Sequence, residues 1–218
     1  KIKFPDLLRF GTSVRLRMDR IREITSFSAL TCLQQSIMNL GILAVQGLVN
    51  SFGTTVMAAF AAAVKIDAFA YLPVQDFGNA FSIFTAQNFG AKKTDRIKKG
   101  IRVAFLVSLV FGVISSLAVF FLAKPLMMLF IDASESAVIA EGVRYLQIEG
   151  SFYYLIGFLF LLYGLYRALG KPGMSVVLTI VSLGLRVLLA YTFSAIPALG
   201  VVGIWWSIPI GWVLADAL

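Results

Sequence analysis

Long uncharged stretches alternate with short polar turns along most of the chain, and their lengths match membrane crossings. A transmembrane helix needs about 20 apolar residues to span a hydrocarbon layer of about 30 Å. The stretch from Ile24 to Val64 contains 41 residues without a charge, which is too long for one crossing. A polar turn with a glycine, at residues 50–54, divides it in two. The pattern therefore predicts a chain that crosses the membrane repeatedly.

Applied to the whole chain, this pattern predicts an all-α polytopic membrane protein with six transmembrane helices. A basic segment at residues 1–23 precedes a six-helix transmembrane lobe at residues 24–218. Pro73 lies inside the second helix, where the missing backbone donor predicts a kink. The helices are expected at about residues 26–49, 54–88, 103–123, 138–167, 174–195 and 201–218.

Positive charges concentrate in segments that the predicted topology places on one side of the membrane. Residues 1–23 hold seven Lys and Arg, residues 92–102 hold six, and the turn at residues 167–171 adds two, so 15 of the 19 cations fall there. Cytoplasmic loops carry an excess of Lys and Arg, so this side and both chain ends are predicted to be cytoplasmic. The net charge of +8 is thus explained by topology, with anionic membrane lipids as neighbours and no nucleic-acid partner.

Composition narrows the possible functions further. Hydrophobic residues make up 59% of the chain and charged residues 14%, which argues against a soluble globular domain. The sequence contains no histidine and one cysteine, Cys32, which excludes histidine-based zinc sites and Ser-His-Asp catalysis. We therefore expect no metal site and no cofactor, and we expect that the protein is not an enzyme.

Charged side chains inside the predicted second helix are the first candidates for a functional site, because such charges usually face a bundle interior or a water-filled path. At 100° per residue, Lys65, Asp76 and Asn79 share one stripe, and Asp67 lies about 200° from Lys65. The stripe lines a cavity or forms a buried ion pair between helices. Asp67 either takes part in transport or contacts a neighbouring helix.

The first predicted helix carries a second set of polar side chains. Gln35, Asn39 and Gln46 lie within about 40° of one another on a helix. Amides in a membrane helix also hydrogen-bond across helix interfaces. The residues therefore predict either a ligand-facing stripe or a packing stripe, and the sequence does not separate the two.

Three embedded charges are predicted to lie at the same depth. Lys65, Glu149 and Arg186 each lie ten or eleven residues from the outer end of a predicted helix, which is about 15–17 Å. An isolated charge at that depth is costly, so we expect Glu149 to pair with Lys65 or Arg186. Protonation or ion entry at this cluster would alter the bend at Pro73. The competing interpretation is a static pair that fixes helix packing.

Several motifs, in the right order, resemble the C-terminal half of a multidrug and toxic compound extrusion (MATE) transporter. They lie at the ends or bends of the predicted helices: LQQSIMNLG at 33–41, AAVKIDAFAYLPVQDFGNAFS at 62–82, AQNFGA at 86–91, GLYRALGKPGMS at 164–175 and VVGIWWSIPIGW at 201–212.

The resemblance implies a twelve-helix transporter of two lobes, of which the N-terminal six-helix lobe is missing here. It implies a multi-pass protein of the cell membrane that exports amphipathic or cationic drugs and toxic compounds in exchange for H⁺ or Na⁺. The aspartate that some members carry in the tenth helix has no counterpart at residues 153–162, which are uncharged. The alternative is a flippase of related architecture for a lipid-linked or polysaccharide substrate. Such a cavity needs cations to hold phosphates.

Overall fold

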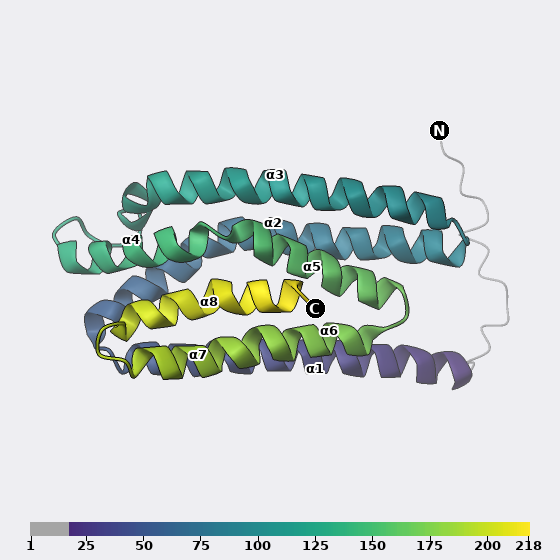
Figure 1. Ribbon diagram of the computed structural model, residues 1–218, viewed down its shortest axis with the longest axis horizontal. Coiled ribbons are helices and arrows are strands. Elements are labelled where there is room, and N and C mark those ends of the chain that lie inside the picture. The colour runs from purple at the N-terminus through teal and green to yellow at the C-terminus, as the bar shows by residue number, and fades with distance from the viewer. Residues whose placement is uncertain (1–17) are drawn as a thin grey trace, which may run out of the picture.

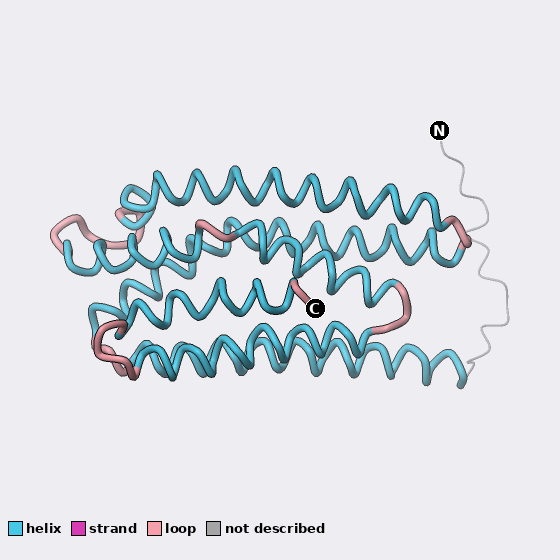
Figure 2. The backbone as a smooth tube through the Cα atoms, viewed as in Figure 1, coloured by secondary structure: helices cyan, strands magenta, loops and turns pink. Residues whose placement is uncertain are grey.

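The computed structural model describes residues 18–218, and the described part is built of helices without any strand (Figures 1 and 2). Most of the predicted basic segment at residues 1–23 lies outside the described residues. The helices are α1 (Met18–Asn50), α2 (Thr54–Gly90), α3 (Thr94–Met127), α4 (Ser136–Gly150), α5 (Tyr153–Ala168), α6 (Pro172–Thr179), a π-helix (Ile180–Gly184), α7 (Leu185–Ser194) and α8 (Gly200–Asp216).

The helix lengths and hydropathies make this a multi-pass membrane protein. Among the described residues, four helical segments are long and apolar enough to cross a membrane: Ile24–Asn50, Thr54–Gly90, Thr94–Met127 and Pro172–Ser194. The pair α4 and α5, which is bent by 52°, makes a fifth crossing if the two helices form one broken span. The apolar helix α8 has 17 residues and is about 26 Å long, which is less than the hydrocarbon thickness. The expected number of six crossings is therefore not confirmed.

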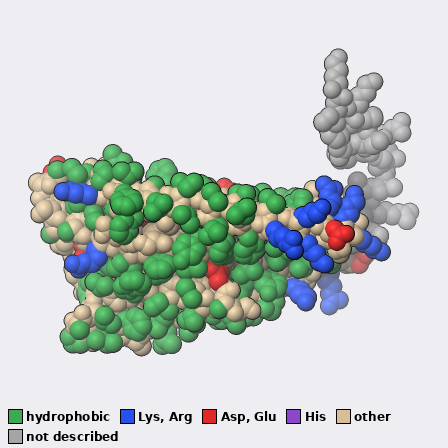
Figure 3. Space-filling model, turned by 45° about the horizontal axis from the view of Figure 1, so that its top comes forward, with side chains coloured by type: hydrophobic (Ala, Val, Ile, Leu, Met, Phe, Trp, Pro, Cys, Tyr) green, Lys and Arg blue, Asp and Glu red, His purple; other side chains and the backbone are tan. Residues whose placement is uncertain are grey.

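The helices run along the long axis of the molecule, and the connections gather at its two ends. The start of α1, the α2–α3 turn and the α5–α6 turn lie at one end, and the α1–α2, α3–α4 and α7–α8 turns lie at the other (Figure 1). Lys and Arg side chains gather at the first of these ends, which we call the cationic end (Figure 3). The last residue, Leu218, lies about midway along the long axis (Figure 1).

Two predicted helices differ in form from the expectation. The helix expected at residues 138–167 is interrupted at residues 151–152, where α4 ends and α5 begins in a new direction. The helix expected at residues 174–195 contains the π-helix, whose wider turn is often found at functional sites. Helix α2 changes direction along its length (Figure 1), and it contains Pro73, the residue at which the sequence predicts a kink.

Glycines allow α2 and α5 to pack backbone against backbone. A Cβ atom added at Gly164 would lie 2.5 Å from the carbonyl oxygen of Gly78, and one added at Gly78 would lie 2.8 Å from the carbonyl oxygen of Phe160. Membrane helices associate through such small residues because lipid provides no hydrophobic drive for association. The close approach of α5 to α2 places the buried face of α2 against α4 and α5, where the polar residues described next are found.

Candidate functional site

The carboxylate of Asp67 is the centre of a buried polar cluster. Asp67 lies in α2 and is 6% exposed. The Tyr145 hydroxyl from α4 donates a hydrogen bond of 2.7 Å to Oδ2, and the Tyr153 hydroxyl from α5 donates one to Oδ1. Both carboxylate oxygens therefore have a donor, which is what a buried carboxylate requires for stability.

The break between α4 and α5 explains how both tyrosines reach the same carboxylate. Tyr145 precedes the break at residues 151–152, and Tyr153 follows it. In a straight helix, residues eight positions apart lie about 12 Å apart along the axis and about 80° apart around it. The bend of 52° changes the direction of α5 relative to α4, and the two hydroxyls converge on Asp67.

A cavity of about 150 Å³ lies beside this cluster, and the exposed side chains of Ile42 and Val64 form part of its lining. Its walls come from every helix of the described chain except α3 and α6. Most of the wall is apolar or aromatic, and its acidic and basic side chains are Asp67, Glu149 and Arg186. The cavity has room for several water molecules.

Glu149 and Arg186 each bring an unpaired polar atom to this cavity. Glu149, in the last turn of α4, is 6% exposed, and its Oε2 atom has no hydrogen-bond partner within the described residues. The Nε atom of Arg186 in α7 is likewise buried without a partner there. Two carboxylates and one guanidinium thus share a cavity of low polarity. If all three are ionised, their charges sum to one negative unit.

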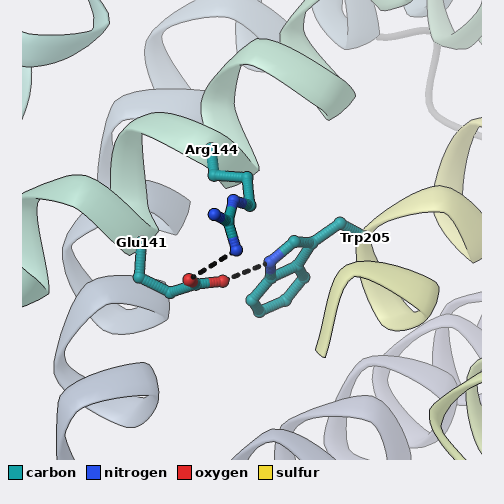
Figure 4. A network of polar contacts seen from close by, with 3 residues as sticks. All are labelled: Glu141, Arg144 and Trp205. Atoms are coloured by element: carbon teal, nitrogen blue, oxygen red, sulfur yellow. Dashed lines mark hydrogen bonds and ion pairs between the residues drawn. The ribbon is translucent and has the colours of Figure 1, made fainter. Parts of the chain in front are cut away.

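A second polar network supports one wall of the cavity from the end opposite the cationic end. The indole nitrogen of Trp205 in α8 donates a 2.9 Å hydrogen bond to Glu141 Oε1 in α4, and Arg144 lies 3.5 Å from Glu141 Oε2 (Figure 4). Trp205 is fully buried, and its ring contacts Tyr145 edge-on at a centroid distance of 4.8 Å and stacks on Phe60 at 5.5 Å. Tyr145 and Phe60 both line the cavity, so this network fixes the position of its wall.

The structure separates the three charges that the sequence placed at one depth. Arg186 and Glu149 line the same cavity, although no ion pair joins them in the part of the chain that is described. Lys65 is exposed, does not line the cavity, and has its Nζ 5.8 Å from the centre of the Phe130 ring. The structure therefore does not bring Lys65 to Glu149.

The other polar residues singled out in the second helix lie outside the cavity. Asp76 and Asn79 are exposed, and Asn79 Oδ1 accepts a 3.0 Å hydrogen bond from Arg167 in α5. Pro73 is also exposed. Asp67, predicted to lie about 200° from Lys65, is instead the buried member of the group. The stripe thus faces outward from the lobe, toward lipid or toward another part of the full transporter.

The amides of α1 also lie at the surface of the lobe. Gln35 and Asn39 are exposed, and Gln46 donates a 3.1 Å hydrogen bond to Asn50 one turn further along the same helix. Gln46 therefore bonds within its own helix. The neighbouring Gln34 is the buried amide of α1, at 6% exposure.

Sequence reasoning missed the tyrosines of the cluster. Neither Tyr145 nor Tyr153 was among the candidate functional residues predicted from the sequence. The signal that points to them is the Glu149-Gly150-Ser151 sequence in mid-helix, where a charge, a glycine and a serine together indicate a break inside the membrane.

A helical membrane lobe with ionisable side chains around an interior cavity is the type of structure found in secondary transporters. A family model described as MatE matches residues 31–192 of the chain. The chain therefore belongs to the MatE family, the multidrug and toxic compound extrusion transporters, as the motifs indicated.

Two curated relatives come from Bacillus subtilis (strain 168). The chain is 27% identical over 207 residues to the probable multidrug resistance protein YoeA, and the match covers 93% of this chain and 44% of YoeA. It is 29% identical over 164 residues to the probable multidrug resistance protein YpnP, covering 75% of this chain and 36% of YpnP. The chain therefore spans less than half the length of these relatives.

Solved structures of MATE transporters share the fold. A MATE transporter in complex with MaL6 matches with a TM-score of 0.87 at 19% identity, over 93% of this chain and 46% of that one. A variant of the Vibrio cholerae MATE transporter VcmN matches with a TM-score of 0.85 at 22% identity, again over 93% and 46%. The chain thus has the fold of one half of a MATE transporter.

Proposed function

We propose that the full-length protein containing this chain is a secondary active transporter of the cell membrane that exports amphipathic or cationic drugs by antiport with H⁺ or Na⁺. Membership of the MatE family supports the transporter class. The curated names of the two Bacillus relatives support drug export. Because this chain covers less than half of those relatives, transport requires the N-terminal six-helix lobe as a partner.

The observation that carries the proposal is the charge balance of the interior cavity. Asp67, Glu149 and Arg186 face a largely apolar space, and their formal charges leave one negative unit without a counterpart. An uncompensated charge is costly in such surroundings. A proton or a monovalent cation that enters the cavity removes the imbalance, and that is the property a coupling-ion site requires.

The two carboxylates take different roles in this proposal. Both oxygens of Asp67 already accept hydrogen bonds from tyrosines, so Asp67 is the fixed carboxylate that the cluster holds in place. The unpaired Oε2 atom of Glu149 is the atom that accepts the proton or contacts the cation. Arg186 provides the positive charge that keeps the pair of carboxylates together in the interior.

Polar residues at the lobe surface provide the path for the substrate. Asp76 and Asn79 on α2 and Gln35 and Asn39 on α1 are exposed, and in a two-lobe transporter the substrate passes between the lobes. An acidic side chain among neutral amides suits a cationic or amphipathic compound. The interior charges argue less for a flippase of phosphate-bearing lipids, because two carboxylates outnumber one arginine at the cavity.

The test is transport by the full-length protein in proteoliposomes of defined orientation. Ethidium or norfloxacin flux is measured with an imposed pH gradient, an imposed Na⁺ gradient, and no gradient. We expect gradient-driven flux with one of the two ions and no flux from vesicles that contain residues 1–218 alone. Flux that is indifferent to both gradients, or that the six-helix piece supports alone, overturns the proposal.

A further inference from the structure

A long apolar groove runs along the outside of the lobe between α2 and α3. Two adjoining hollows, of about 200 and 350 Å³, share Phe77 of α2 and Val107 of α3 as lining residues. The first begins at Pro73, and the second reaches Phe84 and Gly100. The two hollows therefore form one continuous groove. Except for Ser108, their walls consist of apolar residues and glycine.

The dimensions of the groove match one leaflet of a bilayer. Pro73 and Phe84 are eleven residues apart in α2, which corresponds to about 17 Å along the helix. One leaflet contributes about 15 Å to the hydrocarbon layer. The groove thus extends from Pro73, about halfway along α2, toward the α2–α3 turn, which lies at the cationic end (Figure 1).

The groove is open to lipid because α3 is the outermost helix of this face. Of the most apolar 18-residue segment of α3, 22% is buried. The side chains of Val103 and Val107, which line the groove, are 60% and 46% exposed. Side chains of α3 that point away from the groove, such as Leu109 and Phe120, are also exposed. An apolar helix exposed around much of its circumference faces hydrocarbon.

Two cations continue the line of the groove at its headgroup end. At 100° per residue, Lys93 and Arg96 lie within about 50° of the mean direction of the groove-lining residues of α3. Lys98 and Arg102, at the same end of α3, lie about 150–170° from that direction, as does Asp95. A positive pair therefore stands above an apolar channel of acyl-chain length. The first turn of α3 also has the positive end of the helix dipole there.

We propose that this groove binds an anionic phospholipid of the leaflet at the cationic end, with one acyl chain along α2 and α3 and the phosphate at Lys93 and Arg96. The acyl chain lies against Pro73, so the bound lipid packs beside the bend of α2. This assignment rests on the groove and its charges and is independent of the coupling-ion site.

Native mass spectrometry of the full-length transporter tests the proposal, with phosphatidylglycerol and phosphatidylcholine of identical chains as probes. We expect phosphatidylglycerol to be retained more tightly. Each Lys or Arg near an anionic headgroup strengthens binding about fivefold, so Lys93→Gln with Arg96→Gln lowers the affinity by about 30-fold. The matched control, Lys98→Gln with Arg102→Gln, has the same net charge and leaves the affinity unchanged. Equal retention of both lipids, or equal losses in both double variants, overturns the proposal.

A second pair of variants, one test and one control, probes the apolar part of the site. Val107→Trp fills the groove and removes the bound lipid, whereas Val110→Trp, at a residue that is 50% exposed and does not line the groove, retains it. A phosphatidylglycerol with a photoreactive acyl chain tests the unaltered transporter as well, and this result does not depend on whether a variant folds. Crosslinks in residues 73–84 and 100–111 support the proposal. Failure of the lipid to label these residues means that a helix of the other lobe or bulk lipid occupies the groove, and the proposal is wrong.

Discussion

Tyr145 and Asp67 are 78 positions apart in the sequence, and a 2.7 Å hydrogen bond joins the hydroxyl of one to the carboxylate of the other in the interior of the lobe. Tyr153 bonds the second oxygen of the same carboxylate. This arrangement ties α2 to both halves of the broken span formed by α4 and α5. The stability of the lobe therefore depends on two hydroxyl groups that a phenylalanine would lack.

Tyr145→Phe and Tyr153→Phe should each destabilise the full-length transporter by about 1–3 kcal/mol, because each leaves a buried carboxylate oxygen without its donor. Thermal unfolding in detergent measures the change. Tyr191→Phe is the matched control, since Tyr191 is 50% exposed on α7 and should tolerate the loss of its hydroxyl. Unchanged unfolding temperatures in both cluster variants would show that the two bonds add no stability.

Removing a glycine at the contact of α2 with α5 should also destabilise the lobe. A Cβ at Gly164 would lie 2.5 Å from a backbone oxygen of Gly78, which cannot move without shifting α2. We expect Gly164→Ala to cost about 1–3 kcal/mol, the typical cost of overpacking. Gly47→Ala in α1 is the control, because its Cβ would meet no atom within 4 Å and alanine favours a helix. Similar unfolding temperatures for both variants would contradict the packing argument.

The distribution of cations predicts which end of the lobe faces the cytoplasm. A cysteine at Lys93, at the cationic end, should react with an impermeant thiol reagent only after cells are opened, and a cysteine at Ser134, in the α3–α4 loop, should react in intact cells. Both are introduced in a Cys32→Ser background. Ser134 serves better than Gly53, whose φ of 97° disfavours any other residue. Labelling of position 93 in intact cells would reverse the topology.

The class of fold could be predicted from the sequence, because the bilayer limits the structures that long apolar segments can adopt. Uncharged stretches of about 20 residues separated by polar turns have few solutions other than membrane helices. The break at residues 151–152 was not predicted, because no proline marks the boundary and the Glu149-Gly150-Ser151 sequence is a weaker signal for a break than a proline.

The interior site was harder to predict than the helices for a physical reason. Helical periodicity gives relative directions around one axis, but it does not say which direction faces a neighbouring helix. Helical periodicity predicts that Asp67 and Lys65 point about 200° apart, but it does not say which of the two is buried. In the structure, Asp67 is buried and Lys65 is exposed. The partners of Asp67 come from α4 and α5, whose mutual bend no single-helix argument contains.

Glu149→Gln separates a working coupling site from a static one. Glutamine keeps the size of the side chain and removes the charge that a proton or cation would neutralise. If Glu149 couples the ion, the rate of gradient-driven drug efflux should fall at least about tenfold in the variant. The free-energy cost of one uncompensated charge in an interior of low polarity is more than about 1.4 kcal/mol, which corresponds to this factor of ten. Proteoliposome flux is measured per folded molecule, and the unfolding temperature should change little.

The matched control for this test is Glu135→Gln, at an exposed residue just before α4, where the same change should leave efflux intact. Asp67→Asn should behave differently from Glu149→Gln, because Asp67 holds two tyrosines in place and its replacement disturbs packing as well as charge. A loss of stability in Glu149→Gln with normal efflux per folded molecule would assign Glu149 a structural role. Normal efflux with normal stability would mean that the unpaired Oε2 atom takes no part in coupling, and that the coupling ion binds elsewhere in the full transporter.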